Sequence, residues 1–277
     1  MTYTLVYTSP AGSFEFSLES GNWVERFNSP SAVSVAFSVA KGSQKYGARI
    51  EDQKVSPANI SIEGTIMGDS TERRRKMQRV FAPMQKGILT FNGEYFMEVY
   101  PKESVMLERF VRNPRFNVSL YAPDPYWHNL GGTTTPLYGA EAMFSFPWTY
   151  GAPIQFSTAS NGTVNVRNDS DAPSLWELEM LATGTVTNPR ITKTHTGEFL
   201  QVNTTFNEGE KLFVSTTGEE ITLYKVNADG SEVDIFNKLD IESTKFMLDV
   251  GDNMIEFAPT DGTAQATLHF YKNFAGV

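Results

Sequence analysis

Hydrophobic and polar residues alternate along most of this chain, and the alternation is clearest in residues 116–121 (FNVSLY). A period of two residues is typical of a strand that buries one face. Pro123 and Pro125 follow, and they end the strand because proline has no N–H to donate and restricts the residue before it. Residues 130–136, rich in Gly and Thr, then resemble a loop or linker. The pattern predicts a domain boundary directly after this strand.

Short alternating segments separated by turn residues occur on both sides of this boundary. In residues 88–100 an Asn-Gly pair joins two such segments, which predicts a tight antiparallel hairpin. From residue 161 onward, turns recur about every 8–12 residues, as in an antiparallel sandwich. We therefore predict an all-β chain of two domains, 1–122 and 161–277, with a seam and linker region at 123–160.

Residues 69–82 are the segment with clear helical periodicity. Asp69 and Glu72 have the spacing of a capping box, in which each side chain accepts a backbone N–H of the first turn. The basic residues of this segment would form either a phosphate-binding patch or a solvated helix face. We favour the solvated face, because no aromatic residues are interleaved. The apolar positions are Met77, Val80, Phe81 and Met84, and the basic ones are Arg73, Arg74, Arg75, Lys76 and Arg79.

Charge is divided unequally between the two halves. Residues 1–122 hold 15 Lys and Arg against 12 Asp and Glu, a net charge of +3. Residues 123–277 hold 8 against 20, a net charge of −12, and the two halves sum to −9. This asymmetry predicts two surfaces with different uses. The acidity of the whole chain argues against a general nucleic-acid-binding protein.

The 277-residue chain contains no cysteine, which excludes disulfides and cysteine-ligated metals. This composition fits folding in a reducing cytoplasm. The first residues lack the basic and apolar regions of a signal peptide. No run approaches the roughly 18 apolar residues of a membrane-spanning helix, so we expect no membrane partner.

Few side chains are arranged for chemistry. His128, His195 and His269 stand far apart and lack metal-binding spacing, and phosphate-loop, dinucleotide and nucleophile-elbow motifs are absent. The carboxylates of the second half leave two possibilities open, a glycosidase pair and a calcium site. A glycosidase pair is defined by the distance between two carboxylates in space, so sequence spacing does not exclude it. Each is more simply the polar side of a sheet, so we expect no catalytic, cofactor or metal site and no enzymatic activity. The acidic candidates are Glu177, Glu179, Glu219, Glu220, Asp229, Glu232 and Asp234.

Five stretches taken together resemble the distal tail proteins of phages with long, non-contractile tails, the siphophage tail-component family. Two lie before the predicted linker, a helix-then-hairpin unit at 70–100 and the strand ending in aromatic residues and proline at 116–129. Three lie after it, at 208–239 (EGEKLFVSTTGEEITLYKVNADGSEVDIFNKL), 246–257 (FMLDVGDNMIEF) and 269–277 (HFYKNFAGV).

The stretch 246–257 matches an ending of that family written f-x-L-x-x-G-x-N-x-I. The matching residues are Phe246, Leu248, Gly251, Asn253 and Ile255. The resemblance implies an N-terminal β barrel-like domain with one helix and a galectin-like C-terminal β-sandwich. Residues 130–160, with Trp148, match nothing that we recognise in the family.

The same resemblance implies a structural virion protein at the tail tip. In that family the N-terminal domains form a homo-hexameric ring that joins the tail tube protein to tail-tip or baseplate proteins, with a receptor-binding protein as a further partner. Genome DNA passes through such a ring without specific binding. The protein would be made and folded in the bacterial cytoplasm, and no cofactor is implied.

Two other classes of function remain open at this point. A carbohydrate-binding sandwich would stack sugars on exposed aromatic rings such as Trp148 and Trp176. A glycosidase acting on cell-wall or exopolysaccharide is the second. Binding to a glycan array would favour the former, and loss of hydrolysis after a Glu→Gln change would favour the latter.

Overall fold

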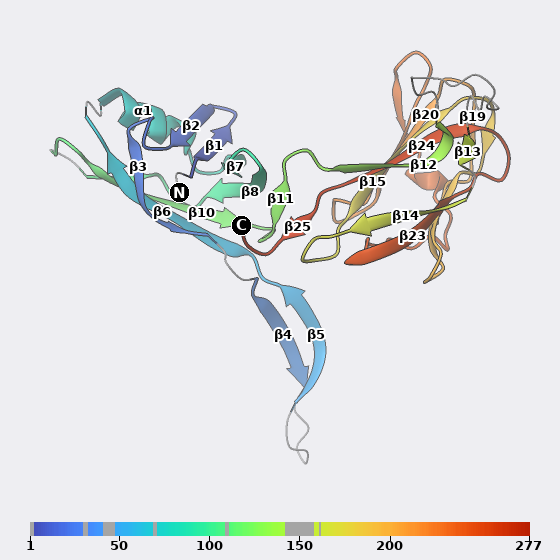
Figure 1. The fold of residues 1–277 in the computed structure, drawn as a ribbon, viewed down its shortest axis with the longest axis horizontal. Coiled ribbons are helices and arrows are strands. Elements are labelled where there is room, and N and C mark those ends of the chain that lie inside the picture. Colours follow the sequence, from blue (N-terminus) through green and yellow to red (C-terminus); the bar gives the residue numbers. More distant parts are fainter. Residues whose placement is uncertain are drawn as a thin grey trace, which may run out of the picture. The chain divides into compact units, whose positions relative to one another are not determined.

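The chain forms two compact units in this computed structural model, which describes residues 3–29, 33–40, 48–68, 71–108, 111–141, 158–160 and 162–277 (Figure 1). The first unit contains Met1–Leu130 together with Asn273–Val277. The second unit contains Gly131–Lys272. Both are built almost entirely of antiparallel strands, so the predicted two-domain all-β class is confirmed.

The first unit is organised around a sheet in the order β2-β1-β7-β8-β10-β6-β3. Three short strands pair beside this path, because β11 joins β8 and β25, and β9 joins β10. The strands are β1 Leu5–Ser9, β2 Gly12–Phe16, β3 Asn22–Asn28, β6 Ala58–Ile66, β7 Gly87–Phe91, β8 Tyr95–Pro101, β9 Met106–Leu107, β10 Arg115–Ala122, β11 Trp127–Asn129 and β25 Asn273–Phe274.

The two ends of this sheet approach each other, which gives the unit its barrel-like form. Asn22 of β3 donates a hydrogen bond from Nδ2 to the carbonyl oxygen of Glu15 in β2 at 2.7 Å. The helix α1, Thr71–Val80, packs on β2 and buries Met77 and Val80 in the same core as the inward side chains of the strands. The predicted barrel-like domain with one helix agrees with this arrangement.

The helix ends at Val80 rather than at the predicted residue 82. Position 69 lies outside the described residues, and the chain leaves the helix after Val80. Phe81 is fully buried, but Met84, which we placed on the apolar face, is 96% exposed at a φ of 66°. The apolar face therefore ends at Phe81, because the turn at Pro83 points the next residues out of the core.

The predicted hairpin at 88–100 is confirmed as β7 and β8. Asn92 and Gly93 both have positive φ, 52° and 70°, as a tight turn of this kind requires. The pairing runs from Phe91↔Tyr95 to Gly87↔Val99.

The segment after β10 differs from the predicted linker at 123–160. The indole of Trp127 is fully buried in the first unit and donates from Nε1 to Ser29 Oγ at 3.1 Å. Trp127 also pairs with Phe274, so the end of the chain returns to the first unit. The boundaries therefore fall after Leu130 and after Lys272 rather than at 122 and 161, because strand pairing outweighs the two prolines.

The second unit is a sandwich of a seven-stranded sheet, β13-β12-β24-β15-β20-β21-β22, and a four-stranded sheet, β14-β23-β17-β18. The strands β20, β21 and β22 form an antiparallel meander, in agreement with the turns predicted every 8–12 residues. The elements are β12 Thr133–Glu141, β13 Thr158–Ser160, β14 Thr163–Asn168, β15 Trp176–Ala182, β16 Val186–Thr187, β17 Arg190–Lys193, β18 Glu198–Gln201, β19 Thr205–Phe206, β20 Lys211–Ser215, β21 Thr222–Val226, β22 Glu232–Asp234, η1 Phe236–Lys238, β23 Gly251–Phe257 and β24 Ala264–Phe270.

A single apolar core lies between these two sheets. Leu178 and Met180 of the larger sheet and Ile255 and Phe257 of the smaller sheet are each at most 1% exposed. Alternate residues of both sheets face this core, as in an antiparallel sandwich. Burial of about 1.5–3 kcal/mol per large apolar side chain makes this core the main source of stability of the unit.

Tyr7 brings a polar group into the core of the first unit. Its ring is 0% exposed and stacks on Phe81 with 4.2 Å between centroids, and it leaves no room for a Cβ on Gly87. Its hydroxyl oxygen is buried without a hydrogen-bond partner among the described residues. Burial raises the pKa of Tyr7 to about 12 from the ordinary 10.0, because the phenolate would lose its hydration.

We expect this shift to make the first unit lose stability at alkaline pH. Between pH 10 and 12 the unfolded tyrosine releases its proton while the folded one keeps it, so the free energy of unfolding falls as pH rises through this window. Tyr7→Phe should reduce that loss by on the order of 1–3 kcal/mol and change stability at pH 7 by only about 1 kcal/mol or less, since it removes an unpaired hydroxyl. Urea unfolding of both proteins at pH 8 and pH 11 measures the difference, and equal pH dependence would contradict it.

Candidate functional site

A separate two-stranded hairpin is the most unusual surface feature of the first unit. β4, Val35–Ala40, pairs with β5, Arg49–Val55, and with no other described strand. In Figure 1 it extends away from the remaining strands of its unit. The backbone hydrogen bond from Ser56 N to the Ser34 carbonyl oxygen, 2.8 Å, closes its base.

The two faces of this hairpin differ in polarity. Pairing brings Val35 opposite Val55, Phe37 opposite Gln53 and Val39 opposite Ile50, and these side chains share one face. Small or polar pairs occupy the other face, for example Ala36 with Lys54 and Ser38 with Asp52. A bulge between Ser38 and Val39 keeps the apolar set aligned despite one extra residue in β5. We call the face that carries Val35, Phe37, Val39, Ile50 and Val55 the apolar face of the hairpin.

The apolar face is open to solvent. Phe37 is 54% exposed and Ile50 is 57% exposed, and the three valines are 42–47% exposed. A two-stranded hairpin is at best marginally stable alone in water. Exposed apolar side chains gathered on one element are typical of a protein–protein contact. The alternation of apolar and polar residues along β4 does not itself show that its apolar side faces outward.

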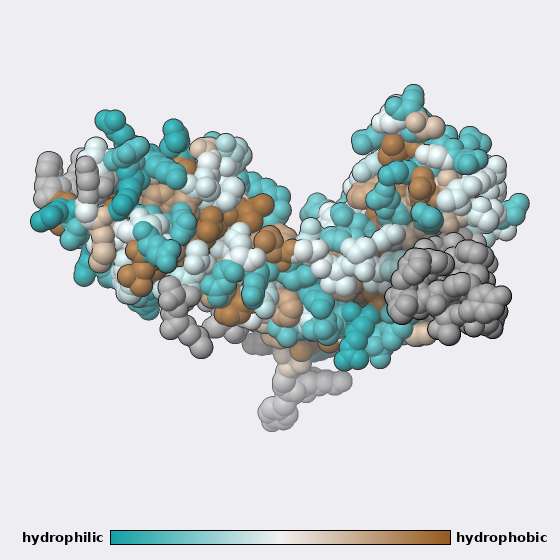
Figure 2. All heavy atoms as spheres, turned by 45° about the horizontal axis from the view of Figure 1, so that its top comes forward, coloured by the Kyte–Doolittle hydropathy of each residue, from teal (hydrophilic) through white to brown (hydrophobic). Residues whose placement is uncertain are grey.

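The basic residues of α1 divide into two groups. The guanidinium of Arg73 donates to the carbonyl oxygen of Met67, and Arg74 Nη2 donates to the carbonyl oxygen of Glu108 at 2.8 Å. These two hold neighbouring loops to the helix. Arg75, Lys76 and Arg79 lie on the exposed side, where the surface over α1 is hydrophilic (Figure 2).

Each of the three histidines lies near a different carboxylate. His128 contacts Asn273 through Nδ1 at 3.0 Å, and its Nε2 is 3.5 Å from Asp124. The other two are in the second unit, His195 at 3.7 Å from Asp249 and His269 at 3.9 Å from Glu177. Among the described residues, no group of three or more potential ligands could hold a metal ion.

The acidic candidates of the second unit mostly have structural partners. Glu177 accepts a hydrogen bond from Ser215 Oγ at 3.1 Å, and Glu179 pairs with Lys211 at 2.8 Å. Glu219, Glu220 and Glu232 lie exposed on the surface.

Asp229, Glu232 and Asp234 are the candidates for calcium, and the first and last of them form turns. Ser231 donates its hydroxyl and its backbone N–H to Asp229, and these hydrogen bonds lower the pKa of that carboxyl. Asp234 accepts a hydrogen bond from the backbone N–H of Phe236 at 2.8 Å. Phe236 is the first residue of the short helix η1.

Trp176 does not form the exposed aromatic platform that a carbohydrate-binding sandwich needs. Its side chain is fully buried, packs at a tilt against Phe246 with 4.9 Å between ring centroids, and donates from Nε1 to the Phe246 carbonyl oxygen at 3.0 Å. Trp148, the other candidate, lies outside the described residues. None of the described helices is long and apolar enough to cross a membrane.

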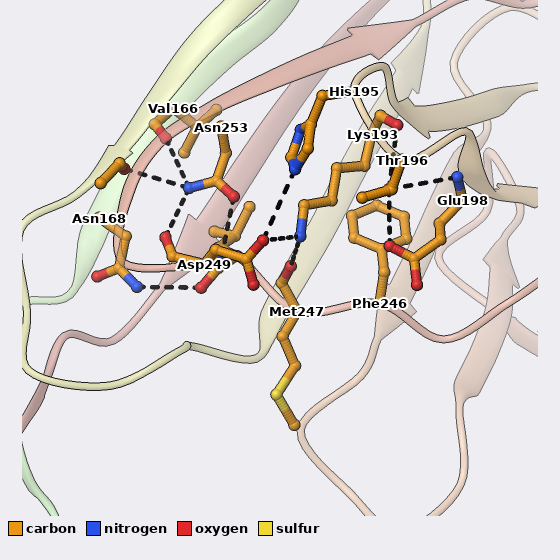
Figure 3. A network of polar contacts seen from close by, with 12 residues as sticks. Val166, Asn168, Lys193, His195, Thr196, Glu198, Phe246, Met247, Asp249 and Asn253 are labelled. Atoms are coloured by element: carbon orange, nitrogen blue, oxygen red, sulfur yellow. Dashed lines mark hydrogen bonds and ion pairs between the residues drawn. The ribbon is translucent and has the colours of Figure 1, made fainter.

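The stretch 246–255 forms a turn held by the side chain of Asn253, which is 0% exposed (Figure 3). Its Oδ1 accepts the backbone N–H of Asp249 at 2.8 Å. Its Nδ2 donates to the carbonyl oxygens of Asp249, Gly251 and Val166 at 2.7, 3.2 and 3.3 Å. Gly251 has a φ of 98°, which a residue with a Cβ rarely adopts.

Buried side chains complete the same turn. Phe246, Leu248 and Ile255 are each at most 2% exposed. Lys193 is nearly buried and donates from Nζ to the Met247 carbonyl oxygen at 2.9 Å and to Asp249 at 2.6 Å. The five motif residues identified in the sequence therefore have structural roles, two in turn geometry and three in the core.

The comparisons with known proteins agree with this architecture. Residues 169–274 match the family model of the siphovirus-type tail component, C-terminal domain. No curated protein matches the chain significantly. The resemblance to siphophage tail components is thus confirmed, and the sequence match lies in the second unit except for its last two residues.

Solved structures extend the match to the whole chain. The Dit protein of phage SPP1, described as a paradigm of the hub adsorption apparatus in phages that infect Gram-positive bacteria, has a TM-score of 0.70 at 16% identity. The match covers 99% of this chain and 100% of that one. Chains of the phage P2 baseplate in its activated conformation, with calcium and with strontium, have TM-scores of 0.56 and 0.54 at 10% identity. Each covers 100% of this chain and 99% of the other, which shows a shared fold.

We expect Asn253→Ala to destabilise the second unit by about 2–4 kcal/mol, because the buried N–H of Asp249 and three carbonyl oxygens lose their partner. Asn253→Asp should also destabilise, since it keeps the acceptor but turns a carboxylate oxygen toward those carbonyls. Asn165, exposed on β14, is a matched control, and Asn165→Ala should change stability by about 0.5 kcal/mol or less. Urea unfolding measures all three, and an Asn253→Ala variant as stable as the control would contradict the assigned role.

Proposed function

We propose that this protein is a structural hub of a long, non-contractile phage tail and that it has no enzymatic activity. It would form the ring at the end of the tail tube and carry the tail-tip or baseplate proteins. The match of residues 169–274 to the tail-component family supports this role, as does the hub-like fold of the whole chain. The observation that carries it is the hairpin β4–β5, whose apolar face requires a partner.

The partner of that face, in this proposal, is a second copy of the chain. A contact between a hairpin and a different surface of the next copy is heterologous, and a heterologous contact closes into a ring when its rotation allows. Six copies is the number that the resemblance to distal tail proteins implies. Burying the exposed parts of Phe37 and Ile50 alone would contribute about 1.5–3 kcal/mol at each contact, before the costs of association.

The charges of the two units support a ring built from the first unit. With the boundaries of the structure, the first unit holds 15 basic and 13 acidic residues, a net charge of +2, and the second holds 8 and 19, a net charge of −11. Six second units crowded around one axis would repel each other within a screening distance of about 8–10 Å. Peripheral second units avoid this cost, so they are free to contact other tail proteins.

The remaining partners follow from the place of such a ring in a tail. The tail tube protein would bind one side, and a tail-tip protein and a receptor-binding protein would bind the other side or the periphery. Genome DNA would pass through the centre without sequence-specific contacts. The chain would fold in the bacterial cytoplasm and be located at the tail tip of the virion.

The mass of the native assembly tests the ring. Six chains of 30.9 kDa come to about 185 kDa, which light scattering or native mass spectrometry resolves. We expect Phe37→Ser to shift the assembly toward the monomer, because it removes the largest side chain of the apolar face. Ala36→Ser, the neighbouring position on the opposite face, is the matched control and should leave the assembly unchanged.

Two results would contradict this proposal. One is a wild-type chain that stays monomeric at high concentration, both alone and mixed with its tail-tube and tail-tip proteins. The other is an assembly in which Phe37→Ser and Ala36→Ser have equal effects, because the contact would then not use the apolar face.

A further inference from the structure

A pocket of about 460 Å³ opens on the first unit, and none of its lining residues belongs to the hairpin. β3, β6, β9 and β10 each contribute to its lining. Its charged side chains are Glu25, Glu63 and Glu108 against Arg115, a net charge of −2. This excess of negative charge argues against phosphate or nucleic acid as the ligand, and no group able to hold a metal ion occurs among the described residues.

Two of the three carboxylates are held in place by neighbouring groups. Glu25 accepts a hydrogen bond from Thr65 Oγ1 at 2.6 Å, and its other oxygen lies 3.9 Å from the Arg115 guanidinium. Glu108 accepts the backbone N–H of Arg115 at 3.1 Å. These contacts fix the orientation of acceptors around the pocket before any ligand arrives.

The pocket also contains acceptors without a matching donor. Asn117 Oδ1 is buried and has no hydrogen-bond partner among the described residues. Glu63 lies directly across from Asn117 in the β6–β10 pairing and belongs to no described ion pair or side-chain hydrogen bond. An unpaired buried acceptor costs about 1–3 kcal/mol, so a donor that entered the pocket would recover part of that energy.

The rest of the lining is apolar and borders a free strand edge. Met106, which pairs with Asn117, contributes apolar surface and is 59% exposed, whereas Phe116 and Leu107 face the core on the other side of the sheet. Met106 and Leu107 form β9, which pairs with β10 alone among the described strands. The opposite edge of β9 can therefore take up an added strand.

We propose that this pocket binds a lysine or arginine side chain of an extended segment from a different protein. The segment would pair with the free edge of β9, its cationic head would meet Glu63 and Asn117 Oδ1, and its aliphatic stem would lie along Met106. Only a cation with an aliphatic stem satisfies the net negative charge, the unpaired acceptor and the apolar wall together. The ring contact described above uses other residues, so failure of one proposal leaves the other standing.

The probe is the peptide acetyl-Thr-Val-Arg-Val-Thr-amide, titrated into the full-length protein and followed by NMR. Its counterpart with citrulline in place of arginine has nearly the same shape without the charge. We expect the arginine peptide to bind weakly, in about the millimolar range, because one side chain supplies most of the contact. The citrulline peptide should bind at least about fivefold more weakly, and 300 mM salt should weaken only the arginine peptide.

Three variants locate the binding in the pocket. Glu63→Gln should weaken the arginine peptide about 5–10-fold, whereas Arg115→Gln should strengthen it about threefold, because Arg115 neutralises part of the acidic lining. Glu103→Gln, an exposed carboxylate outside the pocket, is the matched control and should change nothing. Opposite changes in peptide affinity for Glu63→Gln and Arg115→Gln would distinguish charge recognition from a structural effect.

Other results would overturn the proposal. These are equal binding of the two peptides, no binding of either, or a Glu63→Gln variant that binds like the control. Loss of self-association in Glu63→Gln would assign the pocket to contacts between copies, and it would overturn the assignment to a different protein.

Discussion

The pairing of β11 with β25 determines the organisation of the whole chain. Trp127 and Phe274 lie opposite each other in this pairing, and His128 contacts Asn273 within it. Because both strands belong to the first unit, the second unit is an insertion whose two ends are fixed. Trp127 is fully buried, so the pairing is anchored in a core rather than formed by two loose chain ends.

This organisation separates two kinds of surface. The first unit has nearly balanced charge and carries the hairpin with its exposed Phe37 and Ile50, so it is suited to contacts between identical chains. The second unit has most of the negative charge, and its acidic side chains are largely engaged in turns and sheet pairs. Each histidine of the second unit lies 3.7–3.9 Å from one carboxylate, and no group of three or more potential metal ligands occurs among the described residues.

The turn around Asn253 shows why a short motif of common residue types can still identify a structure. Gly251 is required by a positive φ, and Asn253 is required because one side chain must both donate and accept in a buried site. Phe246 is required by the indole of Trp176, which it contacts from another part of the chain. Such requirements leave a sequence pattern because few residue types satisfy each of them.

The sequence by itself determined the strands, the helix at α1 and the Asn-Gly hairpin, because periodicity and turn chemistry depend on neighbouring residues. It also contained the 246–255 motif, whose family resemblance pointed to a tail protein. It did not reveal that β25 returns to β11, that Trp176 is buried, or that the Phe37 face is open. Those features depend on which distant segments meet, and a local alternation of apolar and polar residues is the same whether its apolar side faces a core or solvent. Only the tertiary structure decided between these cases.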